Sequence, residues 1–309
     1  MKLAVVIPSK NGLHHLKECL PTVVRAAQNS AHEVMVTVVD DNSTDNTLTA
    51  LPPLFPSVQV VANPQRGVCS ARNWGVTHTP GDWIVFLDND VFLEEQFFDT
   101  LSQYFLEDVF CVSCCGYCAY PTVEGTEEQL DGVKLFQWRN GYPRFTGNVY
   151  NQNLPPSGPY FSWGVQGAYF ACNRKKFDQL GGYDLLFEPY LLEETDLAYR
   201  GLKRGWRILY APNTAPHHKC GGTINSKKSS YTKYLSKRNR ILFVWKNIHS
   251  KKLLLRHFCW LLLRPHFKAI YQCLKLLPQI KQKRKEEFAC RVYSDEELLF
   301  FSQQGKYTH

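Results

Sequence analysis

The sequence predicts an α/β fold in which a mixed, mostly parallel sheet is flanked by helices and is followed by a C-terminal helical extension. The first ninety residues alternate short apolar runs, rich in β-branched residues, with segments of helical period. Connections of this kind between strands are right-handed and build a parallel sheet. With 309 residues, of which 44% are hydrophobic, the chain is long enough to bury a full core.

The N-terminal elements follow from this alternation. The expected strands are Leu3–Pro8, Val34–Asp40, Val58–Ala62 and Trp83–Asp88, and the expected helices are Leu13–Gln28 and Val68–Thr77. Each strand is a short apolar run, whereas each helical segment repeats its apolar residues every three or four positions. We therefore expect four neighbouring strands before residue 90.

The second half is less regular. We expect a strand at Val109–Ala119, a loop over Pro121–Gly158, an apolar run at Tyr160–Cys172, a helix from Glu194 to Arg204 and a closing strand at Trp206–Ala211. So long a loop inside a compact domain is usually functional. Beyond Gly222 the composition shifts to Lys, Arg, Leu and aromatic residues at helical spacing, which indicates a separate helical region.

The basic residues are unevenly distributed. The formal net charge is +8, yet the stretch from Leu197 to Lys285 holds 22 Lys or Arg and no Asp or Glu. Such a block normally faces phosphate on a nucleotide, a nucleic acid or an anionic lipid surface. The sign of the charge alone leaves these three partners open.

The eleven cysteines are odd in number, so a complete disulfide framework is not implied. Four of them, at 111, 114, 115 and 118, form two adjoining C-x-x-C pairs. Structural zinc ligands usually come in pairs separated by a long loop, so we interpret these cysteines as small apolar residues of a strand. The apolar run Leu3–Ile7 is too short for a signal peptide. We expect a protein of the reducing cytosol.

Polar clusters follow three of the expected strands. They are Pro8–Asn11, Asp40–Ser43 and Asp88–Asp90. Ligands of parallel sheets gather at the carboxyl ends of the strands. Asp88 and Asp90, two residues apart, suit Mg²⁺ or Mn²⁺ while leaving positions open for phosphate, although Asp and Asn also favour ordinary turns after strands.

Four motifs occur in order along the first part of the chain. They are V-V-I-P-S-K-N at 5–11, V-D-D-N-S-T-D at 39–45, G-V-C-S-A-R-N at 67–73 and D-N-D at 88–90. In these the sequence resembles the inverting, nucleotide-sugar-dependent glycosyltransferases of family 2, of the bacterial surface-polysaccharide type. The segments Gly181–Asp184 and Leu192–Arg200 extend the resemblance to about the first 240 residues.

The resemblance implies a GT-A fold with a catalytic domain over residues 1–225, split into a Rossmann-like nucleotide-sugar half at 1–120 and an acceptor half at 121–225, and a basic helical region at 226–309. It implies donor contacts from Pro8, Ser9, Asn11, Asp40, Asp41, Arg66, Gly67, Arg72, Asp88 and Asn89. It implies a Mn²⁺ or Mg²⁺ ion at Asp88 and Asp90.

The resemblance also implies a general base near the start of the helix after Leu192. Glu194 matches the position of that base, where the family usually has Asp, so Glu193 stays a second candidate. His217-His218, followed by Gly221-Gly222, is similar to a family segment of which one histidine completes the metal ligands or touches the diphosphate. Arg238 and Arg240, around Asn239, resemble a helix that grips the leaving diphosphate, for which guanidinium geometry is suitable.

Acceptor contacts are expected from Trp163, Gly167 and Asp196. Trp163 and Trp138 suit stacking on a sugar face, although core packing is the commoner role of Trp. Asp196 and Arg200 also have the spacing of an ordinary i,i+4 ion pair.

The segment Lys251–Lys285 mixes leucines and aromatic residues with cations. Its apolar run of roughly eleven residues is shorter than the ~20 of a spanning helix, but basic helices of this type suit the plane of an anionic bilayer. We expect a peripheral protein at the inner face of the cell membrane and no nucleic-acid partner.

The function that we expect is transfer of a sugar from a UDP- or dTDP-sugar to a hydroxyl of a saccharide or lipid-linked saccharide. Two alternatives are transfer to a polyprenyl phosphate, and a non-catalytic nucleotide-binding protein. A phosphate acceptor is already ionised and needs no general base, so the role of Glu194 separates the first two.

Overall fold

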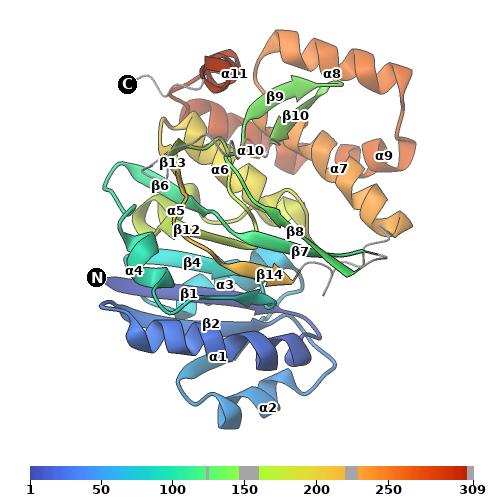
Figure 1. The fold of residues 1–309 in the computed structure, drawn as a ribbon. Coiled ribbons are helices and arrows are strands. Elements are labelled where there is room, and N and C mark those ends of the chain that lie inside the picture. Colours follow the sequence, from blue (N-terminus) through green and yellow to red (C-terminus); the bar gives the residue numbers. More distant parts are fainter. Residues whose placement is uncertain (123–124, 146–159, 220–228, 305–309) are drawn as a thin grey trace.

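The computed structural model describes residues 1–122, 125–145, 160–219 and 229–304. Within these residues, eight strands form one central sheet in the order β11-β13-β6-β12-β4-β1-β2-β3 (Figure 1). The strands are β1 Lys2–Ser9, β2 Glu33–Asp40, β3 Val58–Ala62, β4 Trp83–Leu87, β6 Val109–Cys114, β11 Tyr160–Phe161, β12 Tyr169–Asn173 and β13 Arg207–Ala211.

The sheet is mixed and mostly parallel, as predicted. Strands β1 to β4 run parallel to one another, as do β6 and β13, whereas β12 lies antiparallel between β4 and β6. The four N-terminal strands and both N-terminal helices lie within a few residues of the ranges expected from periodicity.

Each face of the central sheet packs against its own apolar core. Along β4, Ile84 and Phe86 enter one core, while Val85 and Leu87 enter the other. This alternation is the two-residue period of a strand buried on both faces. The flanking helices are α1 Leu13–Asn29, α2 Thr47–Leu54, α3 Val68–His78, α4 Phe97–Ser102, α5 Arg174–Leu180 and α6 Glu193–Lys203, with a short 3₁₀ turn at Leu185–Phe187.

The expected single strand Val109–Ala119 is wrong. The chain leaves the central sheet after β6 and enters a four-stranded sheet, in which β5 Val91–Phe92, β14 His217–Lys219, β7 Tyr117–Thr122 and β8 Gly125–Leu130 lie side by side in that order. The strand breaks because its backbone changes partner. The Cys115 amide donates to the carbonyl of Ala211 at the end of β13, whereas the Tyr117 amide donates to the carbonyl of Pro216 just before β14.

The expected loop Pro121–Gly158 is also more ordered than its composition indicates. It contains β8 and a hairpin of β9 Phe136–Arg139 and β10 Tyr142–Phe145, and residues 146–159 lie outside the described part. Asn140 and Gly141, both with positive φ, form the two-residue turn of this hairpin. An Asn-Gly pair between two strands is a strong hairpin signal, which the composition of the segment alone does not reveal.

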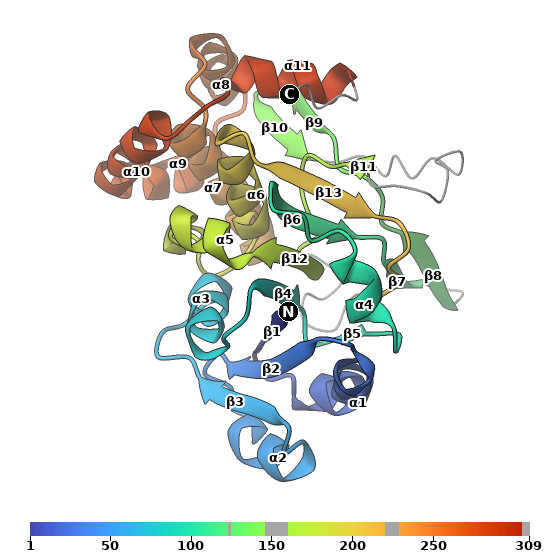
Figure 2. The same ribbon diagram turned by 90° about the vertical axis from the view of Figure 1, so that its left-hand side faces the viewer.

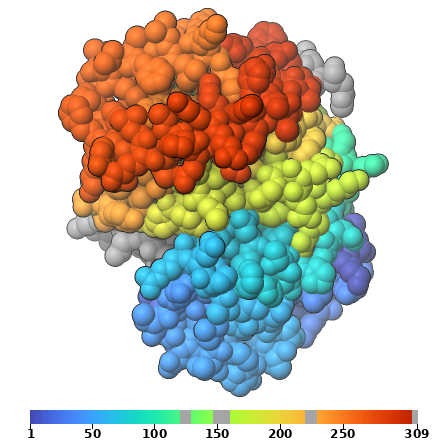
Figure 3. Space-filling model, turned by 180° about the vertical axis from the view of Figure 1, so that it is seen from behind, coloured from blue at the N-terminus to red at the C-terminus, as the bar shows by residue number. Residues whose placement is uncertain are grey.

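Five helices follow β14 in the described part of the chain: α7 Ser230–Asn247, α8 Lys251–Leu263, α9 Phe267–Lys275, α10 Leu277–Ala289 and α11 Asp295–Gln304. They cover one end of the molecule (Figures 2 and 3). Their buried side chains join the core that contains α3, α5 and α6. Buried ion pairs link α7 and α11 to α6, through Lys246 with Asp196 and Lys203 with Asp295.

These helices therefore share one core with the sheet, and a domain division at residues 225 and 226 stays a prediction. Among the described residues, none of the helices combines the length and apolar character that crossing a membrane requires.

Candidate active site

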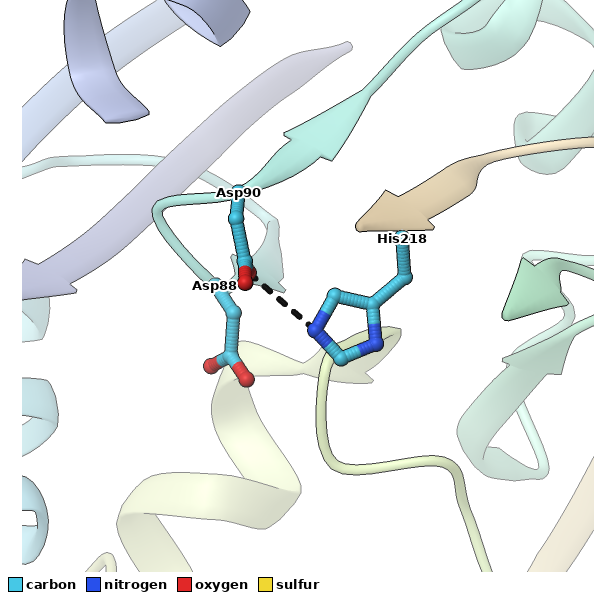
Figure 4. Close-up of side chains that lie close together, drawn as sticks. All are labelled: Asp88, Asp90 and His218. Atoms are coloured by element: carbon cyan, nitrogen blue, oxygen red, sulfur yellow. Dashed lines mark ion pairs between the residues drawn. The ribbon is translucent and has the colours of Figure 1, made fainter. Parts of the chain in front are cut away.

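Asp88, Asp90 and His218 meet beyond the carboxyl end of β4 (Figure 4). The two acids lie in the turn between β4 and β5, and β14 pairs with β5 so that His218 lies opposite Val91, the residue after Asp90. The Nε2 atom of His218 is 3.1 Å from Oδ1 of Asp90. One ligand atom from each of the three side chains falls within 4.8 Å of the others.

This set of two carboxylates and one imidazole fits a divalent cation. Ligand atoms this close can converge on one ion at bonds of about 2.0–2.4 Å, and Mn²⁺ accepts both oxygen and imidazole ligands. Burial disfavours the charged form of His218, but the bonds to Asp90 and Cys118 and the charges of Asp90 and Asp88 outweigh it and raise the pKa of His218 to about 10. A bound ion would replace that proton as the partner of both acids.

A buried polar network lies behind His218. Its Nδ1 is 3.9 Å from Sγ of Cys118, which donates to Asp131. Asp131 also accepts from Tyr169 and Gln166. Partners of this kind orient a ligating imidazole.

Arg72 connects Asp88 with Glu193, which lie at opposite sides of the site. It is 3% exposed on α3, and it donates to Asp88 at 3.0 Å, to Glu193 at 3.1 Å and to the carbonyl of Gly167 at 3.1 Å. All three bonds are to groups of this chain, so Arg72 positions these acids.

Replacing Arg72 by methionine is expected to destabilise the fold. The change leaves the buried carboxyl group of Glu193 without its hydrogen-bond donor, and a buried polar group left unsatisfied costs about 1–3 kcal/mol. Asp88 loses the same donor, so we expect the upper value, about 3 kcal/mol, in urea unfolding.

The matched control is Arg25→Met. Arg25 pairs with Glu95 at 3.8 Å, with both side chains more than half exposed, and such pairs contribute less than about 1 kcal/mol. Equal unfolding midpoints for the two variants would show that the Arg72 contacts add nothing to stability.

The two candidate bases begin α6 but have different surroundings. Both border a cavity of about 290 Å³. Its lining comprises Arg72, Asp88, Cys118, Gln166, Gly167, Ala168, Tyr190, Leu191, Leu192, Glu193, Glu194 and His218. Asp88 and His218 of the candidate metal site therefore border the same cavity as Glu193 and Glu194 at the start of α6.

Glu194 is the better candidate for the base. Glu193 is 7% exposed and bonded to Arg72, and burial together with the charge of Glu194 raises its pKa to about 8 despite the guanidinium. Its carboxyl group is thus engaged within the protein by Arg72. Glu194 is half-buried and lies against Gly167, where a Cβ atom would approach its Cγ to 3.2 Å.

Backbone held in an unusual conformation precedes these acids. Leu191 and Leu192 have φ of 81° and 68°, a region that residues with a side chain rarely adopt. The buried side-chain amide of Asn239, on α7, donates to the carbonyls of Tyr190 at 2.9 Å and Leu191 at 2.7 Å, and to Phe187 at 3.3 Å. Helix α7 thereby fixes the segment that aims Glu194.

The polar residues expected to bind a donor lie at one edge of the sheet. Asn89 donates to Ser9 at 2.8 Å, joining the ends of β4 and β1. Asp41 accepts from the Gly67 amide at 2.9 Å, and Asp40 keeps a buried Oδ1 without a hydrogen-bond partner among the described residues. Pro8 and Asn11 lie partly or fully exposed beside them.

The start of α3 differs from expectation. Glu188 accepts from the Ser70 amide at 2.7 Å, so a carboxylate of this chain occupies the anion position at that helix end. Burial raises the pKa of Glu188 to about 7. Gly67 has a φ of 127°, and a Cβ there would overlap the Glu188 carboxylate. Arg66 is exposed nearby.

Three residues expected at the site lie away from its cavity in this structure. Asp196 is fully buried and pairs with Arg200 and Lys246 in the core. Trp163 is 2% exposed in the core and offers no face for a sugar. His217 is exposed and stacks on Tyr117, on the other side of β14 from the two acids.

The two arginines of α7 do not converge on the acids. Arg238 donates to the carbonyls of Leu186 and Glu188, which places it with Asn239 in holding the loop. Burial lowers the pKa of Arg240, whose neighbours include Arg144 and Tyr142. Gly221 and Gly222 lie outside the described residues.

Other residues of the site were not expected from sequence. Asp131 and Gln166 fall in segments interpreted as loop and apolar run, and their link to His218 exists only through tertiary contacts. Glu188 and Asn239 carry no local motif for their roles. The sequence draws attention to the arginines on either side of Asn239 rather than to Asn239 itself.

Comparison with known proteins agrees with this architecture. Residues 4–180 match the family described as Glycosyl transferase family 2, which covers more than half of the chain. Chondroitin synthase of Pasteurella multocida is 29% identical over 109 residues, 34% of this chain and 11% of that protein. Polypeptide N-acetylgalactosaminyltransferase 10 of Rattus norvegicus is 27% identical over 169 residues, 53% of this chain and 28% of the relative. The chain thus spans less than a third of the length of either protein.

Solved structures share the fold. GalNAc-T7 with UDP, GalNAc and Mn²⁺ aligns with a TM-score of 0.63 at 18% identity, over 82% of this chain and 49% of that one. A mannosyltransferase from Pyrobaculum calidifontis, in complex with GDP-Man and Mn²⁺, aligns with a TM-score of 0.55 at 14% identity, over 98% and 86%. The architecture is the GT-A fold of glycosyltransferases. The chain accordingly belongs to glycosyl transferase family 2.

Proposed function

We propose that this chain transfers a sugar, with inversion, from a nucleotide-diphosphate sugar to a hydroxyl of a saccharide or lipid-linked saccharide. The observation that supports this most is that Asp88 and His218 border the same cavity, of about 290 Å³, as Glu194. A donor held at the acids would present its anomeric carbon to an acceptor beside the glutamate.

Asp88, Asp90 and His218 are the residues that would hold Mn²⁺ or Mg²⁺. When bound, the ion supplies positive charge to the diphosphate as it leaves. Arg72 keeps Asp88 in place, and the network through Cys118 and Asp131 keeps the imidazole oriented.

Glu194 would act on the acceptor. Its carboxylate takes the hydroxyl proton while the acceptor oxygen forms a bond to the anomeric carbon, and the bond from that carbon to the diphosphate oxygen breaks on the opposite face. Attack opposite the leaving group accounts for inversion. Glu193 is buried and bonded to Arg72, which leaves this role to Glu194.

The donor nucleotide is proposed to be UDP or dTDP, bound along Pro8, Ser9, Asn11, Asp40, Asp41 and Asn89. The free Oδ1 of Asp40 can accept from an N–H at the edge of a base or from a ribose hydroxyl. Solved structures with this fold contain UDP or GDP-Man, so both classes of donor belong in the test.

The test is a panel of UDP-, dTDP- and GDP-sugars, each with Mn²⁺ or Mg²⁺, in which release of the nucleotide diphosphate is followed. We expect release from one of these donors with a suitable saccharide, and its loss on chelation with EDTA. Full turnover in EDTA would contradict a metal-dependent transfer.

Asn239→Ala is expected to slow turnover more than it weakens donor binding. The loop carbonyls lose their donor, which costs about 1–3 kcal/mol of stability, and displacement of Glu194 by about an ångström costs up to about 10²-fold in kcat. The measurement is kcat and donor KM from the same titration.

Asn73→Ala is the matched control. The Asn73 side chain also bonds to backbone, because it donates to the carbonyl of Tyr183 and accepts from its amide, each at 2.9 Å. The backbone at Tyr183 does not lead directly into Glu194. A similar loss of stability with a smaller fall in kcat supports a positioning role for Asn239, and equal falls in kcat argue against it.

A further inference from the structure

Helices α8 and α9 and the turn between them carry a surface of exposed apolar side chains, the α8–α9 face. Its large apolar residues are Leu255, Phe258, Leu262, Leu263, Phe267, Tyr271 and Leu274. Leu262, Leu263 and Phe267, at the turn, are 83%, 77% and 78% exposed. A patch of this kind on a folded chain marks contact with another molecule or a membrane.

The apolar exposure is not a sign of poorly packed helices. The opposite sides of α8 and α9 bury Leu253, Leu261, Ala269 and Cys273 in the core shared with the sheet. Each helix therefore has one side in the core and a second apolar side turned to solvent.

Cations surround the exposed apolar residues. Lys251, Lys252, Arg256, Arg264, Lys268 and Lys275 are all exposed, and none takes part in an ion pair within the ranges that the structure describes. Arg264 lies 5.2 Å from the ring of Trp260, and Lys275 lies 4.5 Å from that of Tyr271. The chain offers no Asp or Glu between Leu197 and Lys285 to neutralise them.

We infer that the α8–α9 face binds the surface of an anionic bilayer. Leu262, Leu263 and Phe267 enter the boundary between headgroups and acyl chains, and the six cations contact the headgroups. A basic helix with apolar and aromatic residues on one side binds membranes in this way.

The charges separate this partner from two others. A second copy of the chain, docked by the same face, would bring six cations against six cations. A nucleic acid would satisfy the cations but leave three side chains that are more than three-quarters exposed in water. An anionic membrane provides for both the charge and the apolar residues.

The face lies on the same side of the molecule as the strand ends. Strand β1 starts at the N-terminus on the left of Figure 1 and runs to the right, where the turn between α8 and α9 also lies. Membrane binding by this face would bring the cavity near the bilayer and a lipid-linked acceptor. That consequence depends on the proposed function, whereas membrane binding itself does not.

The test is co-sedimentation of the full chain with vesicles of phosphatidylcholine and phosphatidylglycerol in equal amounts, or of phosphatidylcholine alone. We expect binding to the anionic vesicles and binding to the neutral ones at least about tenfold weaker. The triple variant L262S/L263S/F267S should bind anionic vesicles at least about tenfold more weakly than the wild type.

The control variant is L48S/L54S/L106S, which changes three apolar residues that are 42%, 53% and 45% exposed in the other half of the molecule. It should bind like the wild type, and thermal unfolding should show all proteins folded. Equal vesicle binding by the triple variant and the wild type would overturn the inference. So would a wild-type dimer that the triple variant converts to monomer without any vesicle binding.

Donor turnover in solution keeps this test apart from the proposed function. The triple variant should release nucleotide from a soluble donor at the wild-type rate, because its substitutions lie outside the cavity. Loss of vesicle binding with unchanged turnover supports the inference whether or not the acceptor is lipid-linked.

Discussion

Replacing Glu194 by glutamine is expected to lower kcat for transfer to a hydroxyl acceptor by about 10²–10⁴-fold, the usual contribution of a positioned general base. Glutamine keeps the size of the side chain and its fit against Gly167, but it cannot take the acceptor proton. Binding of the nucleotide diphosphate with Mn²⁺ should stay close to wild type, because Asp88, Asp90 and His218 are unchanged.

Two comparisons make this result specific. Glu94→Gln removes the charge of an exposed glutamate before α4 and should leave kcat unchanged. With a polyprenyl phosphate as acceptor, Glu194→Gln should have little effect, because that acceptor is already ionised. Wild-type turnover of Glu194→Gln with a hydroxyl acceptor would exclude Glu194 as the base and direct attention to Glu193.

Replacing Asp90 by alanine is expected to remove most metal-dependent activity. Asp90 is 4% exposed and contacts His218, so its loss takes away one ligand and the partner of another. Metal stabilisation of a leaving group contributes several kcal/mol, and each 1.36 kcal/mol is tenfold, so kcat/KM should fall on the order of 10²–10³-fold. The fall should be measured across a titration of Mn²⁺.

Asp178→Ala is the control for loss of an aspartate, since Asp178 is exposed on α5. Thermal unfolding shows whether each variant is folded. A variant Asp90→Ala that is folded and turns over donor like Asp178→Ala would remove Asp90 from the metal site.

The sequence was informative where the signal is local. Strands β1 to β4 and helices α1 and α3 follow from apolar periodicity, and the polar residues at the strand ends follow from the topology of a parallel sheet. Asp88 and Asp90 are local in this sense, because their spacing and the strand before them are both visible in the sequence.

The parts that could not be predicted depend on where helices pack. Asp196 lies only two positions after Glu194, yet that step turns the side chain to the far side of α6, where Lys246 and Arg200 surround it. The choice between His217 and His218 depends on the pairing of β14 with β5. Asn239 contacts a loop about fifty positions earlier, and no local pattern records that contact.

We propose that the metal binds at Asp88, Asp90 and His218 and that the donor lies in the adjoining cavity, facing Glu194. The most direct measurement is the anomalous scattering of manganese in crystals of the chain grown with Mn²⁺ and the nucleotide-diphosphate donor identified by the panel. We expect a manganese peak at about 2.0–2.4 Å from Asp90 and His218, with the diphosphate on the ion and the sugar toward Glu194. A manganese peak elsewhere, or a nucleotide bound outside this cavity, would contradict it.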